Sequence, residues 1–201
     1  MNEDPVPLKA VHHVEFWVGN AKQAAYFYRK AFGFNQVAYS GLETGNRDRA
    51  SYVLEQGKIR IIFSTPLNSN NEMSEHIKAH GDGVKDIAFH VDDAKACYEA
   101  CIARGATSAA EPEVITDENG SITKASIYTY GETIHSFISH NDYSGPFLPG
   151  FQEKKIEGKT VGLRFIDHIV GNVELGKMEH WVKFYADIMG FTQLQAFSDD
   201  D

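Results

Sequence analysis

The chain has 201 residues, of which 42% are hydrophobic and 12% aromatic, so it can form one full domain with a buried core and part of a second. Its formal net charge of −9 argues against nucleic acid and anionic membranes as partners, because both favour a basic surface. There is no run of about 18 apolar residues and no apolar stretch in the acidic residues 1–10, so we expect neither a membrane span nor a secretory signal, and a cytoplasmic protein is the default expectation.

The first repeating unit has the order strand, helix, strand, strand, strand. Residues 11–18 alternate apolar with other side chains, which predicts a strand. Asn20 is a suitable N-cap, residues 21–32 carry one apolar helical face, and Gly33 is a suitable helix end. Three strands are then expected, with the hairpin turn "EQGK" between the last two; they cover residues 34–40, 50–55 and 59–64.

The second unit comes after a looser stretch that contains a possible short helix at residues 71–80. A strand is predicted at residues 84–91, then a helix that Asp92 or Asp93 caps and Gly105 ends. Two cysteines lie four apart on this helix, where a disulfide fits poorly, so we interpret Cys97 and Cys101 as reduced thiols, partly in the core. The remaining strands are expected at residues 106–109, 124–130 and 133–139.

A third copy of the plan begins near the end of the sequence. Residues 165–171 predict a strand and residues 177–189 a helix that ends at Gly190. The stretches "FYRKAFGF" and "FYADIMGF" share four positions, which supports the repetition. Residues 192–201 are expected to begin another strand.

The repetition predicts an α+β fold of paired βαβββ modules. We expect a tail at residues 1–10, a first domain of two modules at 11–150, a linker at 151–163, and an incomplete first module of a second domain at 164–201. One such module cannot cover its own sheet face. The last forty residues should therefore be poorly anchored unless they pack on the first domain or on another chain.

The first strand of each unit carries a polar residue at the same place, namely His13, Asp86 and His168. Two histidines and one carboxylate in a facial arrangement hold Fe(II) and leave positions open for substrate and O₂. The alternative is that each is a hydrogen-bonded structural residue. His13 pairs with Glu15 or with Asp86 as candidate ligands, but the last strand of the second unit offers no interior carboxylate, since Glu132 lies at its turn. We therefore favour a first domain without metal, in which His13 and Asp86 are structural.

The remaining histidines give weaker signals. His76 and His80 are four residues apart on the possible short helix, but this stretch is polar. We interpret these side chains as surface or rim residues, and the group comprises His76, His80, His135, His140 and His180.

Three longer motifs carry a family resemblance. They are "HGDGVKDIAFHVDD" at 80–93, "YSGPFLPGF" at 143–151 and "IDHIVGNV" at 166–173. The repeated βαβββ plan resembles the vicinal oxygen chelate superfamily, with its glyoxalase-like fold. Within it, the three motifs in this order resemble the 4-hydroxyphenylpyruvate dioxygenase family over nearly the whole chain.

The resemblance implies two domains, of which the N-terminal one carries no metal and the C-terminal one binds one Fe(II) through two histidines and a glutamate. It places the first histidine at His168, and Val170, two residues along, would line the substrate pocket. The second histidine, the glutamate and most substrate contacts would lie beyond residue 201. No catalytic residue is therefore assigned within this chain.

The implied reaction converts 4-hydroxyphenylpyruvate and O₂ to homogentisate and CO₂ in tyrosine and phenylalanine breakdown, by an enzyme that forms homo-oligomers. We expect this chain by itself to be inactive, because one ligand binds iron weakly. Two alternatives stay open. One is 4-hydroxymandelate synthase, which uses the same substrate and iron. The other is a non-catalytic binding or assembly module formed by residues 11–150.

Overall fold

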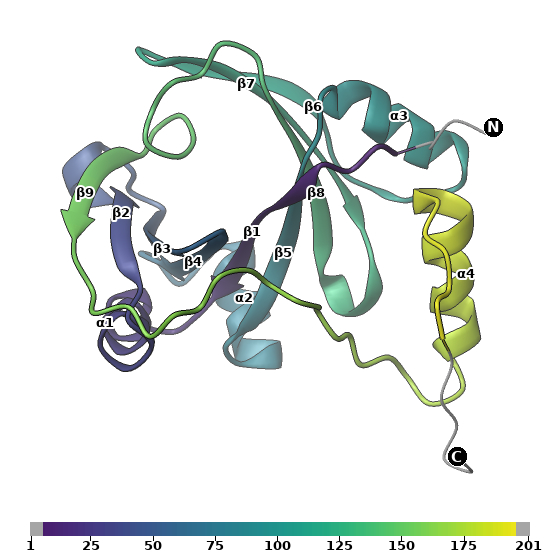
Figure 1. Ribbon diagram of the computed structural model, residues 1–201, viewed down its shortest axis with the longest axis horizontal. Coiled ribbons are helices and arrows are strands. Elements are labelled where there is room, and N and C mark those ends of the chain that lie inside the picture. Colours follow the sequence, from purple (N-terminus) through teal and green to yellow (C-terminus); the bar gives the residue numbers. More distant parts are fainter. Residues whose placement is uncertain (1–5, 196–201) are drawn as a thin grey trace.

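Two units of the same strand–helix–strand–strand–strand plan form the structure, a computed structural model that describes residues 6–195 (Figure 1). The first unit consists of β1 (Ala10–Trp17), α1 (Ala21–Phe32), β2 (Asn35–Ser40), β3 (Arg49–Gln56) and β4 (Ile59–Pro66). The second consists of β5 (Gly83–His90), α3 (Ala94–Ala103), β6 (Ser108–Asp117), β7 (Gly120–Tyr128) and β8 (Ile134–His140). Between and after them lie α2 (Glu72–His80), β9 (Gln152–Ile156) and α4 (Met178–Met189).

All nine described strands belong to one curled sheet, in the order β6-β7-β8-β5-β1-β4-β3-β2-β9. In each unit the first strand lies parallel to the last, as β1 does to β4 and β5 to β8. The two units join at the antiparallel pair β1 and β5, where Glu15 stands opposite Asp86. The predicted α+β fold of paired βαβββ modules is confirmed.

The helices begin and end where the sequence predicts. The side chains of Asn20 and Asp93 each accept a backbone N–H from the first turn of their helices, α1 and α3. Gly33 ends α1 and Gly190 ends α4 in the left-handed conformation, at φ 70° and 76°. None of the described helices combines the length and the apolar character needed to cross a membrane.

The largest apolar core lies between the sheet and α3. Phe89, Phe137 and both cysteines are buried there, and no disulfide joins Cys97 to Cys101. Burial raises the pKa of the Cys101 thiol to about 12, so it stays protonated at neutral pH. The interpretation of the pair as thiols in the core is confirmed.

Strand β6 is longer than the expected strand at residues 106–109. It runs from Ser108 to Asp117 and contains Pro112, which has no N–H to donate to a neighbouring strand. The position is tolerated because β6 is an edge of the sheet and its pairing with β7 shifts register between Ala110 and Glu113. The sequence pattern hides this strand because the proline and the bulge interrupt its alternation.

The expected linker at residues 151–163 is partly a strand. Residues of β9 pair antiparallel with β2 and form the other edge of the sheet. An edge strand exposes unpaired N–H and C=O groups, so even the polar sequence "QEKKI" can pair there. The residues after β9 also lie close to the sheet, since a Cβ on Gly57 would meet the carbonyl oxygen of Arg164 at 2.5 Å.

The prediction of a strand at residues 165–171 is wrong, because this stretch has no regular secondary structure. A strand forms only by pairing, and among the described residues this stretch pairs with none of the nine strands of the sheet. Helix α4 then forms as predicted, because its hydrogen bonds are internal. The expected strand at 192–201 is absent at residues 192–195, and its other residues lie outside the described part, as do residues 1–5 of the tail.

Candidate functional site

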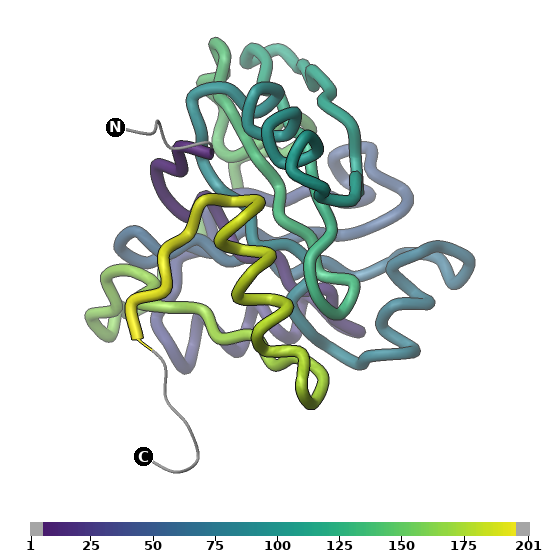
Figure 2. The backbone as a smooth tube through the Cα atoms, turned by 90° about the vertical axis from the view of Figure 1, so that its right-hand side faces the viewer, coloured from purple at the N-terminus to yellow at the C-terminus, as the bar shows by residue number. Residues whose placement is uncertain are grey.

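Helix α4 packs beside α3 on the outer side of the second unit, as Figures 1 and 2 show from two sides. Ile188 and Met189 are buried in the same apolar core as Phe137 of the sheet. The sequence predicts poor anchoring of this region unless it packs on the first domain. The structure meets that condition, because α4 is held by the apolar core of the second unit.

A hydrogen-bonded chain fixes α4 to the sheet. The hydroxyl of Tyr185 lies 2.9 Å from Nε2 of His135 and 3.0 Å from Oγ1 of Thr129. Nδ1 of His135 lies 3.0 Å from the carbonyl oxygen of Ile87, which accepts only, so Nδ1 carries the proton and Nε2 accepts from Tyr185. Burial lowers the pKa of His135 to about 4, which keeps it neutral at physiological pH.

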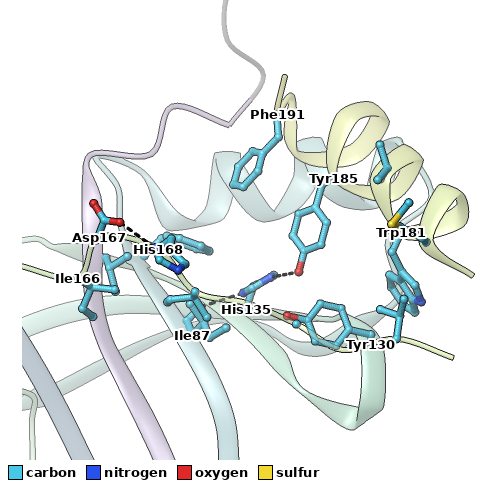
Figure 3. A pocket seen from close by; sticks show the side chains of 16 residues that line it. Ile87, Tyr130, His135, Ile166, Asp167, His168, Trp181, Tyr185 and Phe191 are labelled. Atoms are coloured by element: carbon cyan, nitrogen blue, oxygen red, sulfur yellow. Dashed lines mark hydrogen bonds and ion pairs between the residues drawn. The ribbon is translucent and has the colours of Figure 1, made fainter. Parts of the chain in front are cut away.

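A cavity of about 430 Å³ opens between α4, the segment before it and the central strands (Figure 3). Tyr130, Trp181 and Phe191 line it with aromatic rings. Gly171 also lines it and packs on Tyr130, whose hydroxyl would lie 2.0 Å from a Cβ at this position. The cavity is mainly apolar, which suits a ligand with an aromatic ring.

His168, the ligand that the family resemblance implies, lies at the cavity wall. Its side chain is 73% exposed, and its Nδ1 lies 2.7 Å from Oδ2 of Asp167. A carboxylate on Nδ1 selects the tautomer that carries a lone pair on Nε2, as in many metal-binding histidines. The tautomer that Asp167 favours therefore leaves Nε2 of His168 able to bind a metal.

Val170 does not line the cavity, and it is 75% exposed. Its expected place beside His168 depends on the period of a strand, which this stretch does not form. Its role as a substrate contact stays a prediction.

The described residues do not complete an iron site around His168. Among them, His168 belongs to no group of three histidine, cysteine or carboxylate side chains close enough to share an ion. One imidazole is not the facial set of two histidines and a carboxylate that holds Fe(II).

Inside the first domain, His13, Glu15 and Asp86 offer ligand atoms within 4.8 Å of one another, and all three are buried. From the sequence, these residues are considered only as pairs of ligands, because the third ligand is expected to be a carboxylate on the last strand of the second unit. The structure supplies Glu15 instead, since β1 and β5 are adjacent and Glu15 stands opposite Asp86.

Both carboxylates already have protein partners. Glu15 accepts a hydrogen bond from the hydroxyl of Ser64 at 2.6 Å, and Asp86 accepts one from the backbone N–H of Ser136 at 3.1 Å. Burial raises the pKa of Asp86, which its hydrogen bonds and a nearby cation oppose. Each carboxylate also has a cation at 3.5 Å, and these cations are Arg49 and Lys124.

The histidines of this cluster are bonded to each other. Nδ1 of His12 lies 2.7 Å from Nδ1 of His13, and Nε2 of His12 lies 3.1 Å from Nε2 of His140. Burial lowers the pKa of His12 to about 2 and that of His13 well below its usual value. The ring of Phe147, from the "YSGPFLPGF" motif, packs on both His12 and His13. These contacts support the interpretation of His13 and Asp86 as structural, hydrogen-bonded groups.

Sequence reasoning misplaces two histidines, His76 and His135, which it assigns to the surface or rim. They are 7% and 2% exposed. The signal for His135 is present, because alternation along β8 puts it on the same face as the core residue Phe137. The role of Tyr185 has no such local signal, because its partners lie 50 and 56 residues away.

The comparisons with known proteins agree with this architecture. The sequence profile of the Glyoxalase/Bleomycin resistance protein/Dioxygenase superfamily matches residues 12–123. The chain is 44% identical over 200 residues to a 4-hydroxyphenylpyruvate dioxygenase of Dictyostelium discoideum, which covers 96% of this chain and 54% of the relative. It is 42% identical over 196 residues to a 4-hydroxyphenylpyruvate dioxygenase of Xenopus tropicalis, and this match covers 94% of this chain and 50% of that relative. The chain thus spans about half the length of these relatives.

Among solved structures, a triple mutant of 4-hydroxymandelate synthase from Streptomyces coelicolor superimposes with a TM-score of 0.80. The match covers 96% of this chain and 55% of that one at 21% sequence identity, so it shows a common fold. Because the profile covers more than half of the 201 residues and the fold agrees with it, the chain belongs to the Glyoxalase/Bleomycin resistance protein/Dioxygenase superfamily.

Proposed function

We propose that the chain is part of an Fe(II)-dependent dioxygenase that converts 4-hydroxyphenylpyruvate and O₂ to homogentisate and CO₂. The observation that carries the proposal is the "IDHIVGNV" stretch, which puts His168 at the wall of an aromatic cavity with Nδ1 held by Asp167. The dioxygenase relatives, 42% and 44% identical over nearly the whole chain, support it.

In this proposal His168 contributes one of three iron ligands. Bound iron would supply the redox centre and the template on which the 2-oxo acid and O₂ meet. The described residues contribute orientation: Asp167 sets the tautomer of His168, and the network of Tyr185 holds α4 over the sheet. The enzyme would act in tyrosine and phenylalanine breakdown in the cytoplasm, as a homo-oligomer.

A chimera tests the proposal directly. Residues 1–201 would replace the matching part of the Dictyostelium relative, and the rest of that protein would supply the C-terminal half. With Fe(II), ascorbate and 4-hydroxyphenylpyruvate, the chimera should consume O₂ and release homogentisate and CO₂ in equal amounts. A folded chimera without turnover would overturn the proposal.

The product distinguishes the alternative reaction. A 4-hydroxymandelate synthase would yield 4-hydroxymandelate from the same substrate, but the likeness to that enzyme at 21% identity supports the fold alone. If the residues that determine the product lie in the C-terminal half, which comes from the Dictyostelium relative, the product of the chimera reflects that relative and not this protein. The test of this alternative is therefore the product of the whole native protein.

The 201-residue chain should show no turnover by itself, since one histidine cannot hold the iron in the required geometry. Calorimetry with 4-hydroxyphenylpyruvate separates this from a binding module. Tight binding without turnover would favour the module, and no binding would favour a part of an enzyme.

A further inference from the structure

We propose a second metal site, formed by His76, His80 and Glu132, that binds a divalent ion such as Zn²⁺. It shares no residue with the proposed iron site at His168. The three side chains offer ligand atoms within 4.8 Å of one another. None of them lines the cavity at His168.

The site joins two elements that are distant in the sequence. His76 and His80 stand four residues apart in the last turns of α2, so both face the same side of the helix. Glu132 comes from the short 3₁₀ turn Tyr130–Glu132, which leads into β8. Two histidines at this spacing on a helix are a recurrent zinc-binding pair, to which a carboxylate from elsewhere supplies the third ligand.

The interatomic distances suit one ion. Oε2 of Glu132 lies 3.0 Å from Nε2 of His80 and 3.5 Å from Nδ1 of His76. Ligand atoms about 2.0–2.1 Å from a tetrahedral Zn²⁺ are about 3.3 Å from each other. Oε2 of Glu132 is at about this distance from both nitrogens, and all three ligand atoms lie within 4.8 Å of one another, so side-chain rotation would bring them onto one ion with water in the fourth position.

The buried imidazole of His76 gives independent support for a site at this point. It is 7% exposed, and among the described residues its Nδ1 has no hydrogen-bond partner, although Oε2 of Glu132 approaches it to 3.5 Å. The indole of Trp17 packs edge-on against the imidazole and closes the site on that side. Buried ring nitrogens are normally hydrogen-bonded, so an ion held between Nδ1 and the carboxylate of Glu132 would give this nitrogen a close partner.

The protonation state of His76 is also compatible with metal binding. Burial lowers its pKa, and the nearby Lys85 and His80 lower it further, against the opposing effect of Glu132. A neutral imidazole keeps the lone pair that a metal needs, and a positively charged one does not.

A buried cation, Lys85, lies next to the site. The ammonium group of Lys85 donates to Oε1 of Glu72 at 3.2 Å and to the backbone carbonyl of Glu132 at 2.9 Å. Its charge is therefore offset by Glu72, and it holds the turn that carries Glu132. Glu132 has φ 64°, a left-handed conformation that is unfavourable with a side chain, and from it the carboxylate reaches His80.

The donor set favours one class of ion. Two imidazoles and a carboxylate suit Zn²⁺, whereas Ca²⁺ and Mg²⁺ prefer oxygen ligands alone. Zn²⁺ also binds nitrogen donors more tightly than Fe²⁺ does. The ion would connect α2 with the turn between β7 and β8 and so tie the connection between the two units to the second unit.

Titration of the 201-residue chain with Co²⁺, a spectroscopic substitute for Zn²⁺, tests the site. We expect the visible absorption of four-coordinate Co²⁺ to saturate at one equivalent and to be displaced by Zn²⁺. The variants His80→Ala and Glu132→Gln should each weaken binding at least about tenfold. Both positions are on the surface, so the variants should keep the fold, which circular dichroism would verify.

The matched control is His180→Ala, which removes an exposed histidine that belongs neither to the cluster nor to the proposed iron site and should leave the Co²⁺ spectrum unchanged. Zn²⁺ should also raise the melting temperature of the wild type and of this control, but not of the two site variants. Absence of the Co²⁺ band, or its persistence in both site variants, would overturn the proposal. Neither result would bear on the dioxygenase proposal, which depends on His168.

Discussion

The hydroxyl of Tyr185 on α4 lies 2.9 Å from Nε2 of His135 on β8, and this contact ties the last described helix to the first domain. The contact is partly buried, and the hydroxyl of Tyr185 also lies against the hydroxyl of Thr129, while His135 contacts the carbonyl of Ile87. The chain therefore places a polar connection inside an otherwise apolar interface. Such a connection fixes one position of α4, because a shifted helix would leave buried polar atoms without partners.

Tyr185→Phe should lower the free energy of unfolding by about 1–3 kcal/mol. The substitution keeps the ring but leaves His135 and Thr129 without their partner in a buried place. Urea unfolding followed by fluorescence measures the change. Tyr26→Phe is the control, since Tyr26 is 58% exposed on α1, and it should change little. Equal stability of both variants would contradict the role of the Tyr185 contact.

His135 should make the protein less stable in mild acid. Its folded pKa of about 4 lies below the ordinary value of 6.5, so its contribution is fully present above pH 6.5. The contribution falls as the pH drops towards 4, because the unfolded state then binds a proton that the folded state does not. The total is roughly 3 kcal/mol for a shift of this size.

Urea midpoints of the wild type and His135→Gln between pH 7.5 and 4.5 check this prediction. The variant keeps an amide that can accept from Tyr185 but does not titrate. Other titrating groups, such as His12 and His13, are common to both proteins. The wild-type slope should therefore exceed that of the variant by up to about 1.4 kcal/mol per pH unit. Parallel pH profiles would contradict it.

Gln56→Ala should loosen the segment after β9. The buried amide oxygen of Gln56 accepts from the hydroxyl of Thr160 at 2.7 Å and from the backbone N–H groups of Val161 and Leu163 at 3.1 and 3.2 Å. Its amide nitrogen donates to the carbonyl of Phe32 at 2.6 Å. Loss of these bonds should cost about 1–3 kcal/mol.

Limited proteolysis with cleavage sites mapped by mass spectrometry measures the effect of this change. Cleavage of Gln56→Ala should rise between residues 157 and 176, where the chain has little regular structure. Gln23→Ala, on the exposed face of α1, is the control and should be cleaved like the wild type. An unchanged cleavage pattern in Gln56→Ala would show that the segment is held by other contacts.

His168→Ala should separate function from stability. Because its side chain is 73% exposed, the free energy of unfolding of the 201-residue chain should change by less than about 0.5 kcal/mol. In the active chimera the same change should lower kcat more than about 100-fold, since it removes a proposed iron ligand. His180→Ala, another exposed histidine, should alter neither quantity. Full activity of the His168→Ala chimera would exclude the ligand role.

Val170→Ala tests the predicted substrate contact. Val170 is 75% exposed in this chain, so its truncation should not affect folding. In the chimera it should raise KM roughly tenfold if the side chain touches the aromatic substrate. Val161→Ala, at a residue 59% exposed, provides the comparison. An unchanged KM would remove Val170 from the pocket.

Much of the fold is predictable because its signals are local. Asn20 and Asp93 cap helices, Gly33 and Gly190 end them, and these roles depend on residues within one or two turns. The repeated order of elements then predicts the paired modules. The candidate site is harder to predict from the sequence. His168 is identified by family resemblance. The buried positions of His76 and His135, and the partner of Tyr185, depend on packing across the sheet.

The sequence by itself determined the helices, their ends and the βαβββ repetition, because helical hydrogen bonds and caps join residues close together in the chain. Only the tertiary structure decided that β9 pairs with β2, that residues 165–171 form no strand, and that α4 lies on the second unit. It also decided that Glu132 meets His76 and His80. The physical reason is that strands and polar clusters need partners, and the identity of a partner is a property of the folded chain.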